Sequence, residues 1–179
     1  MRRLVAAQLA DRGFNGVPGK VEAGPPKRLS SAIGQIVNFL GTLQNEWAGA
    51  QAFSSFDTYM APFIRKDGLG YAEVRQAMQE LIFNLNVPSR WGTQTPFTNL
   101  TFDWVCPEDL RDQVPVIGGQ PMNFTYGALQ AEMDMINRAY IEVMTRGDEK
   151  AGSSPFRSRP TTSRRIFPGT ARTPSCCSR

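Results

Sequence analysis

Three polar side chains within one segment rich in proline and glycine are the best candidates in this sequence for binding chemistry. The segment runs from Asn86 to Trp104, and its candidates are Arg90, Gln94 and Thr95. A guanidinium binds phosphate through paired N–H donors, and an amide can pair with the edge of a nucleobase. The alternative is structural: these side chains would satisfy backbone groups where the chain turns from a helix into a strand. We favour the structural role.

Several other kinds of site are excluded by composition. The 179 residues include no histidine, which excludes Ser–His and Cys–His catalysis and histidine-based metal sites within this chain. The three cysteines are Cys106, Cys176 and Cys177, which are too few and too unevenly spaced for a disulfide framework. The glycines form neither a phosphate loop nor a dinucleotide fingerprint.

The net charge of +4 comes from the last part of the chain. Residues 151–179 contain six arginines and no acidic residue, so residues 1–150 carry a net charge of −2. This tail is rich in Arg, Ser, Thr and Pro and has few large apolar residues, a composition typical of disorder. We therefore divide the chain into a folded region, 1–150, and a disordered basic tail, 151–179.

The sequence favours a cytoplasmic protein. No run of 18 apolar residues occurs, so no transmembrane helix is expected. The first residues, Met1 to Ala7, look like the start of a signal peptide, but the apolar run stops at Gln8, and Asp11 and Arg12 follow. Export is therefore not expected.

Apolar residues spaced three or four apart predict three long helices, at about 29–47, 74–85 and 126–143. A shorter helix is expected from Asp57, as its possible N-cap, to just before Gly68. Helices therefore dominate the predicted structure.

Alternation of apolar and polar residues predicts one strand, at 99–105, with Leu100, Phe102 and Trp104 on one face. A short extended segment at 51–53 is also expected. Because sheets need several strands with satisfied edges, the partners of the 99–105 strand are either hidden in this sequence or outside it.

The segment 86–104 resembles the N-x-P-S/T-R-x-G-x-Q-T-P-F-T-N-x-T signature of the anaerobic, glycyl-radical ribonucleotide reductases. The resemblance extends over about residues 8–150, and its further matches are Arg12–Gly16, Pro25–Lys27, Gly34–Ile36, Ala48–Asp57 and Ala61–Phe63. Proline, glycine, arginine and glutamine recur at fixed offsets over a long stretch, so chance is a poor explanation.

The resemblance implies an α/β fold, namely part of the ten-stranded α/β barrel of these reductases, although the chain as it stands is mainly helical. It implies reduction of ribonucleoside triphosphates by radical chemistry, with a glycyl radical, a structural zinc held by four cysteines, and ATP or deoxynucleotide effectors. It also implies a homodimer and a radical-SAM activase as a partner. Membrane and nucleic acid are not among the implied partners.

The residues that carry the family's radical chemistry are missing from this sequence. The thiyl cysteine of the family lies in a Met-Gly-Cys-Arg-like context, whereas Cys106 lies between Val105 and Pro107. The glycyl-radical motif and the zinc cysteines are also missing. We therefore expect a first half-barrel region with no catalytic residue and no metal site, which is inactive alone.

The resemblance also implies two sets of binding residues. Arg90, Gln94 and Thr95 would help to form the wall of the substrate barrel. Glu22, Lys27, Gln35 and Lys66 would bind a nucleoside triphosphate effector, with the lysines meeting phosphates and Gln35 a base. A solvated surface position is the alternative for each lysine.

Two other functions compete with the reading as an enzyme fragment. The first is a non-catalytic module that binds a nucleotide effector or dimerises through residues 28–70. The second is a nucleic-acid-binding protein that acts through its basic tail.

The tail itself is interpreted as the product of a frameshift. In the family, the helix that ends near Gly147 leads into a strand reading GRVFTFPIPTYNIT, and the codons of residues 151–179 are compatible with that text in a neighbouring frame. We predict that the encoding DNA, read with one extra base after the Lys150 codon, continues the reductase frame. Sequencing the DNA and translating all frames checks this, and a tail without a reductase-like neighbouring frame contradicts it.

Overall fold

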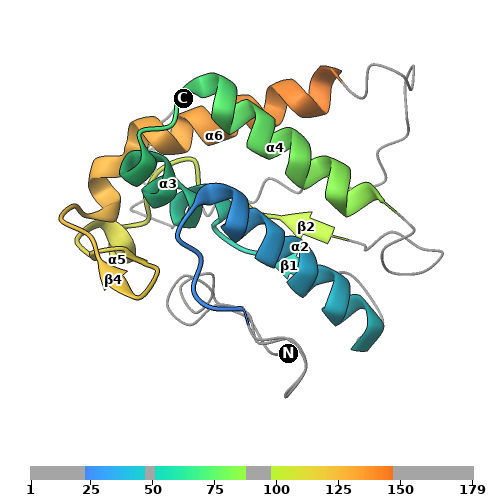
Figure 1. Cartoon of the computed structure of the whole chain (residues 1–179). Coiled ribbons are helices and arrows are strands. Elements are labelled where there is room, and N and C mark those ends of the chain that lie inside the picture. Colours follow the sequence, from blue (N-terminus) through green and yellow to red (C-terminus); the bar gives the residue numbers. More distant parts are fainter. Residues whose placement is uncertain (1–22, 47–50, 88–97, 147–179) are drawn as a thin grey trace, which may run out of the picture.

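The computed structural model describes residues 23–46, 51–87 and 98–146, and helices dominate these ranges (Figure 1). The helices are α2 (Leu29–Glu46), α3 (Phe56–Asp67), α4 (Tyr71–Asn86), the single turn α5 (Glu108–Arg111), the 3-10 turn η2 (Tyr126–Leu129) and α6 (Gln130–Arg146). The strands are β1 (Gln51–Phe53), β2 (Thr98–Leu100), β3 (Val116–Ile117) and β4 (Gln120–Pro121). None of the helices in these ranges is long and apolar enough to cross a membrane.

The helices predicted from apolar spacing are confirmed within the described ranges. The stripes at 29–47, 74–85 and 126–143 correspond to α2, α4 and the continuous pair η2 and α6. The shorter predicted helix is α3, and it ends where Gly68 adopts a φ of 62° and donates its N–H to the carbonyl of Ile64. Only glycine enters this left-handed region without a steric penalty, so Gly68 ends the helix as the sequence predicts.

The predicted strand finds a partner inside the chain. β1 and β2 pair in parallel, with Gln51 opposite Thr98 and Phe53 opposite Leu100. The ladder continues past the strands, because Thr101 N donates to Phe53 O at 3.0 Å and Phe56 N donates to Thr101 O at 2.9 Å. Parallel strands need a long crossover, and α3 and α4 provide it.

The predicted strand is also too long, and its predicted face is wrong at one position. Only residues 98–100 form β2. Leu100 and Phe102 are each 4% exposed, but Trp104 is 37% exposed and has a φ of 65°. A left-handed tryptophan cannot continue a strand, so the alternation in the sequence extends beyond the strand itself.

The side chain of Asp57 explains why the chain turns at this point. Its Oδ1 accepts the N–H of Asp103 at 2.9 Å, and its Oδ2 accepts the N–H of Trp104 at 2.9 Å and the amide of Asn137 at 3.1 Å. Oδ1 also accepts the N–H of Thr58 at 3.0 Å. Asp57 is fully buried. The prediction of Asp57 as an N-cap is therefore wrong: it lies within the first turn of α3 and joins that helix to the segment after β2 and to α6.

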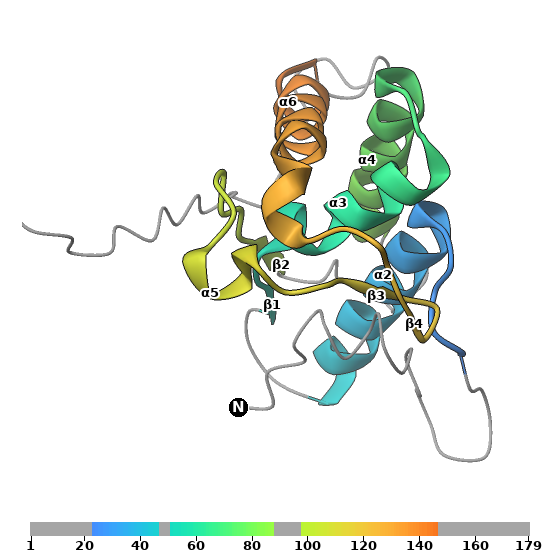
Figure 2. The ribbon, with the colours of Figure 1, turned by 90° about the vertical axis from the view of Figure 1, so that its left-hand side faces the viewer.

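α3 and α6 pack side by side in opposite directions, as Figure 2 shows. Asp57 contacts Asn137 at one end of this pair. At the other end Arg65 Nε forms an ion pair with Glu132 at 3.1 Å, and Arg65 Nη2 donates to Ala128 O at 3.1 Å. Polar contacts at both ends thus fix the register of an interface whose middle is apolar.

Aromatic rings connect the sheet to the helices. The rings of Phe53 and Phe56 meet edge to face at a centroid distance of 6.1 Å, and those of Phe56 and Phe102 at 5.7 Å. Phe102 also contacts Tyr140 of α6 at 4.7 Å. These contacts bury one face of β1 and β2 beneath the helices, and such edge-to-face pairs contribute about 0.5–1.5 kcal/mol each beyond burial.

The hairpin of β3 and β4 was not predicted. Its turn is Gly118-Gly119, with φ values of 61° and 78°. Two consecutive left-handed residues are typical of the tight turn that joins antiparallel strands, for which Gly-Gly is a known signal. The flanking strands are only two residues each, too short for alternation to reveal them.

Replacement of Asp57 by Ala should destabilise the fold by about 3–5 kcal/mol, because it leaves several buried donors without an acceptor. Urea unfolding followed by circular dichroism measures this. Amide hydrogen exchange should accelerate most at Asp103 and Trp104, whose N–H groups lose their acceptor. Asp67→Ala is the control, because Asp67 is exposed on the same helix. Equal unfolding midpoints for the two variants would contradict the role given to Asp57.

Candidate functional site

The structure describes three of the predicted binding residues, Lys27, Gln35 and Lys66. Arg90, Gln94, Thr95 and Glu22 lie outside the described residues, and so does the tail 151–179. The described candidates therefore lie around the start of α2.

Lys66 and Gln35 both hold the segment that leads into α2. Lys66 Nζ donates to the carbonyl of Lys27 at 2.7 Å, and Gln35 Nε2 donates to the carbonyl of Gly24 at 2.7 Å. Lys66 also contacts Asp67 Oδ1 at 3.3 Å. Residues predicted from distant parts of the sequence thus meet around residues 24–27, with α3 on one side and α2 on the other.

The side-chain oxygen of Gln35 is the notable polar atom here. Gln35 Oε1 is buried and has no hydrogen-bond partner among the described residues. A buried acceptor without a donor costs about 1–3 kcal/mol. Its amide nitrogen is already committed to Gly24, so the oxygen is left to receive a donor from elsewhere.

Lys27 approaches the hairpin turn. A Cβ added at Gly118 would lie 2.9 Å from Lys27 Cγ, too close for an ordinary contact. Glycine is therefore required at position 118 for two reasons. Its backbone is left-handed, and the side-chain stem of Lys27 packs against it. The stem of Lys27 thus runs along β3 and β4, while its carbonyl faces Lys66.

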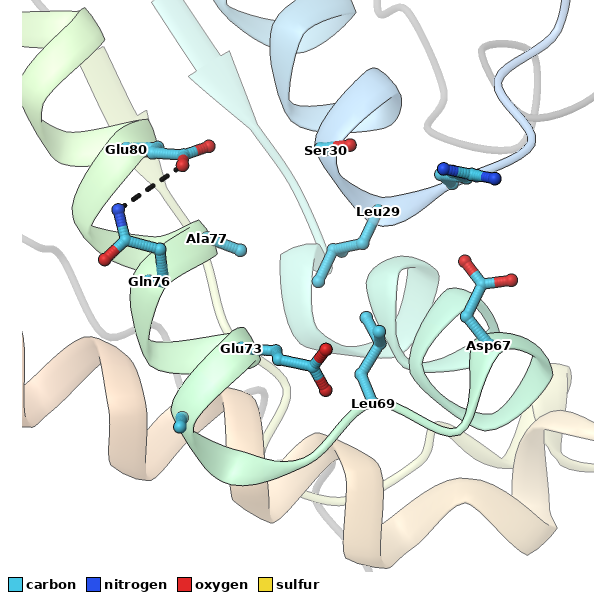
Figure 3. A pocket seen from close by; sticks show the side chains of 10 residues that line it. Leu29, Ser30, Asp67, Leu69, Glu73, Gln76, Ala77 and Glu80 are labelled. Atoms are coloured by element: carbon cyan, nitrogen blue, oxygen red, sulfur yellow. Dashed lines mark hydrogen bonds between the residues drawn. The ribbon is translucent and has the colours of Figure 1, made fainter.

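A pocket of about 470 Å³ opens beside this region, between the start of α2, the end of α3 and the first half of α4 (Figure 3). Its lining residues are Arg28, Leu29, Ser30, Asp67, Leu69, Ala72, Glu73, Gln76, Ala77 and Glu80. None of Lys27, Gln35 and Lys66 belongs to this lining. Sequence reasoning missed Arg28, which carries no signal beyond its position next to Lys27.

The charge of the pocket favours cations over phosphates. Three carboxylates line it against one guanidinium, Arg28. Figure 3 shows Glu80 pointing from α4 toward Ser30 of α2, and Glu73 pointing toward Leu69. Glu73 Oε2 accepts the N–H of Gly70 at 2.8 Å, and Glu80 Oε1 accepts from Gln76 Nε2 at 3.4 Å. The pocket is thus an acidic neighbour of the lysines and does not itself suit a triphosphate.

Cys106 is a buried thiol and not an activated one. It is 5% exposed, and burial raises the pKa of its thiol above the ordinary value. A reactive cysteine needs a lowered pKa and access to solvent, and Cys106 has neither. Within the described ranges, no three Cys, His, Asp or Glu side chains are grouped to hold a metal ion. A four-cysteine zinc site therefore has no counterpart in this part of the chain.

Comparison with solved structures shows which fold this is. The anaerobic ribonucleotide reductase from Thermotoga maritima in complex with dATP and CTP matches with a TM-score of 0.63 and 21% identity. That match covers 79% of this chain and 24% of the other. The same enzyme with dATP in its specificity site matches with a TM-score of 0.62 and 22% identity, over 79% and 25% of the two chains. The chain thus spans about a quarter of the length of these relatives.

Sequence comparison decides the family. No curated protein sequence matches the chain. The family model for the anaerobic ribonucleoside-triphosphate reductase, however, matches residues 4–171, which is most of the chain. That match confirms the resemblance found in the segment 86–104, and the solved structures agree with it at the level of the fold. This chain belongs to the anaerobic ribonucleoside-triphosphate reductase family.

Proposed function

We propose that this chain is part of an enzyme that reduces ribonucleoside triphosphates to deoxyribonucleotides by radical chemistry. The family match over residues 4–171 carries the proposal. Residues 1–150 would form the first half of the ten-stranded barrel, with β1 and β2 as two of its parallel strands. The chain contributes structure and binding and contains no catalytic residue of its own.

The wall of the substrate barrel is the proposed role of Arg90, Gln94 and Thr95. These residues lie on the connection between the end of α4 and the start of β2. Both ends of this connection are held, because Asn86 Nδ2 donates to Ile82 O at 2.7 Å and β2 pairs with β1.

Effector binding is the proposed role of Gln35, Lys27 and Lys66, together with Glu22. The free oxygen of Gln35 is suited to accept a hydrogen bond from the amino group of a base. Lys66 Nζ donates to the carbonyl of Lys27, so the two lysines belong to neighbouring segments, which supports placing phosphates near them. The acidic pocket next to this region would exclude phosphates from its far side.

The remaining parts of the reaction would come from polypeptide outside this chain. A complete enzyme of this kind uses a glycyl radical, a structural zinc held by four cysteines, ATP or deoxynucleotide effectors, a radical-SAM activase and a cytoplasmic homodimer. Cys106 is isolated and buried, so it neither carries the thiyl radical nor starts a zinc site. The residues described here hold the effector and the barrel strands.

A non-catalytic module that binds the effector or dimerises is the alternative function. The observation that favours it is the side-chain oxygen of Gln35, which is buried without a hydrogen-bond partner among the described residues. The two functions share one binding site and differ in whether a complete enzyme needs this chain.

Replacing Gln35 by Leu or Lys66 by Ala should weaken binding of a deoxyribonucleoside triphosphate such as dATP about tenfold, since each removes one polar contact. Isothermal titration calorimetry at fixed ionic strength measures the affinity. Gln79→Leu is the control, because Gln79 is exposed on α4 and lies outside the pocket lining. Unchanged affinity in both variants would refute the effector assignment and leave the family membership intact.

The purified chain should make no deoxyribonucleotide under anaerobic conditions with a radical activase, a reductant and a nucleoside triphosphate. The reason is chemical, since the sequence has neither a glycyl-radical motif nor a matching thiyl cysteine. Product analysis by chromatography checks this, with a complete reductase as the positive control. Turnover that disappears in Cys106→Ser would overturn the proposal.

A further inference from the structure

Two arginines contact one carboxylate where α4 packs against α6, and a third lies over the tyrosine that donates to that carboxylate. Glu142 Oε1 contacts Arg75 Nε and Arg146 Nη1, each at 3.1 Å. Glu142 Oε2 accepts a short hydrogen bond from the hydroxyl of Tyr71. The guanidinium of Arg138 lies over the ring of Tyr71, 5.3 Å from its centroid.

The cluster has an excess of positive charge. Arg75, Arg138 and Arg146 face one carboxylate, Glu142, so the net charge of the cluster is +2. Within the described ranges, Glu142 is the one carboxylate that forms an ion pair with Arg75 or Arg146, and Arg138 forms none. The side chains of Arg75 and Arg146 are 40% and 67% exposed, so donors of the cluster face solvent.

The titration of the two central groups shows the same convergence. The hydrogen bond from Tyr71 and the charges of Arg146, Arg75 and Arg138 hold the pKa of Glu142 below its ordinary value. The hydrogen bond to Glu142 raises the pKa of Tyr71, which Arg138 and Arg75 oppose. Arg75, Arg138 and Arg146 thus lie around the hydrogen-bonded pair of Tyr71 and Glu142.

We propose that Arg75, Arg138 and Arg146 form a binding site for a phosphate group, either inorganic phosphate or the polyphosphate of a nucleotide. Several guanidiniums around one point are what phosphate recognition requires, because each offers paired N–H donors. Arg75 lies in the second turn of α4, whereas Arg138 and Arg146 lie on α6. Glu142 holds the arginines together in the absence of the anion.

This site is separate from the proposed effector region. At about 100° per residue around the helix, positions 71 and 75 lie on one flank of α4 and positions 73, 76 and 80 on the other. The second flank lines the acidic pocket beside α2. The proposal therefore stands independently of the reductase function.

Titration with inorganic phosphate, tripolyphosphate and ATP at fixed ionic strength tests the site, with the full chain. Calorimetry gives the affinity, and NMR of the arginine Nε–H groups shows which guanidiniums respond. Arg138→Ala is the informative variant, because Arg138 forms no ion pair and its loss leaves the Glu142 contacts in place. Arg111→Ala is the matched control, since it removes the same charge from an exposed position on α5.

Saturable tripolyphosphate binding is expected, weakened at least fivefold by Arg138→Ala and unchanged by Arg111→Ala. Glu142→Gln should bind several-fold tighter, because it removes the competing charge. Equal losses in the two arginine variants would mean non-specific attraction and overturn the proposal. If tripolyphosphate binding does not saturate, or if Glu142→Gln does not bind it more tightly, the arginine cluster only links α4 to α6 and the proposal is wrong. Binding of ATP alone that is lost in Lys66→Ala and kept in Arg138→Ala would assign the ligand to the effector region instead.

Discussion

The buried carboxylate of Asp57 is the interaction on which the described structure depends. It is fully buried and accepts hydrogen bonds from α3 itself, from the segment after β2 and from α6. A buried charge is costly unless donors surround it. Here the donors are backbone N–H groups and one amide, so the carboxylate is satisfied only when all three parts of the chain are in place. That requirement ties elements far apart in sequence into one arrangement.

The strained backbone of Trp104 is a direct consequence of this arrangement. A left-handed conformation costs a bulky residue about 1–2 kcal/mol. Its N–H is held by Asp57 Oδ2 at 2.9 Å, and its carbonyl accepts from Gln130 Nε2 at 2.8 Å. The two hydrogen bonds offset the strain and fix the exit of β2. The position of β2 against β1, and with it one end of the 86–104 segment, thus follows from a side chain on α3.

The elements of this fold were largely predictable from the sequence, and their connections were not. Helices with a full apolar stripe, such as α2 and α4, were correctly placed because burial of one face repeats every three or four residues. The predicted length of β2 was wrong. The alternation of apolar and polar residues continues through Phe102 into a turn, and the carboxylate of Asp57, distant in the sequence, fixes that turn. The hairpin around Gly118 was too short to show a pattern. Local periodicity contains no information on either feature.

The same distinction applies to the candidate sites. Gln35 and Lys66, grouped through the resemblance, both contact the segment before α2, and their role in binding an effector stays a prediction. What the sequence did not contain is that Gln35 has one free oxygen, that the adjacent pocket is acidic, and that three arginines surround Glu142. Each of these depends on how α2, α4 and α6 pack together, and residues 40 to 70 positions apart meet there only after folding.

α4 contributes Arg75 to the arginine cluster on one flank and lines the acidic pocket on the other, and its packing decides whether these two surfaces influence each other. Val74, Met78 and Leu81 form its buried stripe, each with no measurable exposure. A helix anchored by such a stripe moves only by breaking close-packed contacts, which is unfavourable in a dense core. Coupling between two sites requires an element with two discrete positions. An anion at Arg138 therefore acts on α4 chiefly by strengthening its attachment to α6, and the acidic flank beside α2 keeps its geometry. The two flanks of α4 are thus independent binding surfaces carried by one rigid helix.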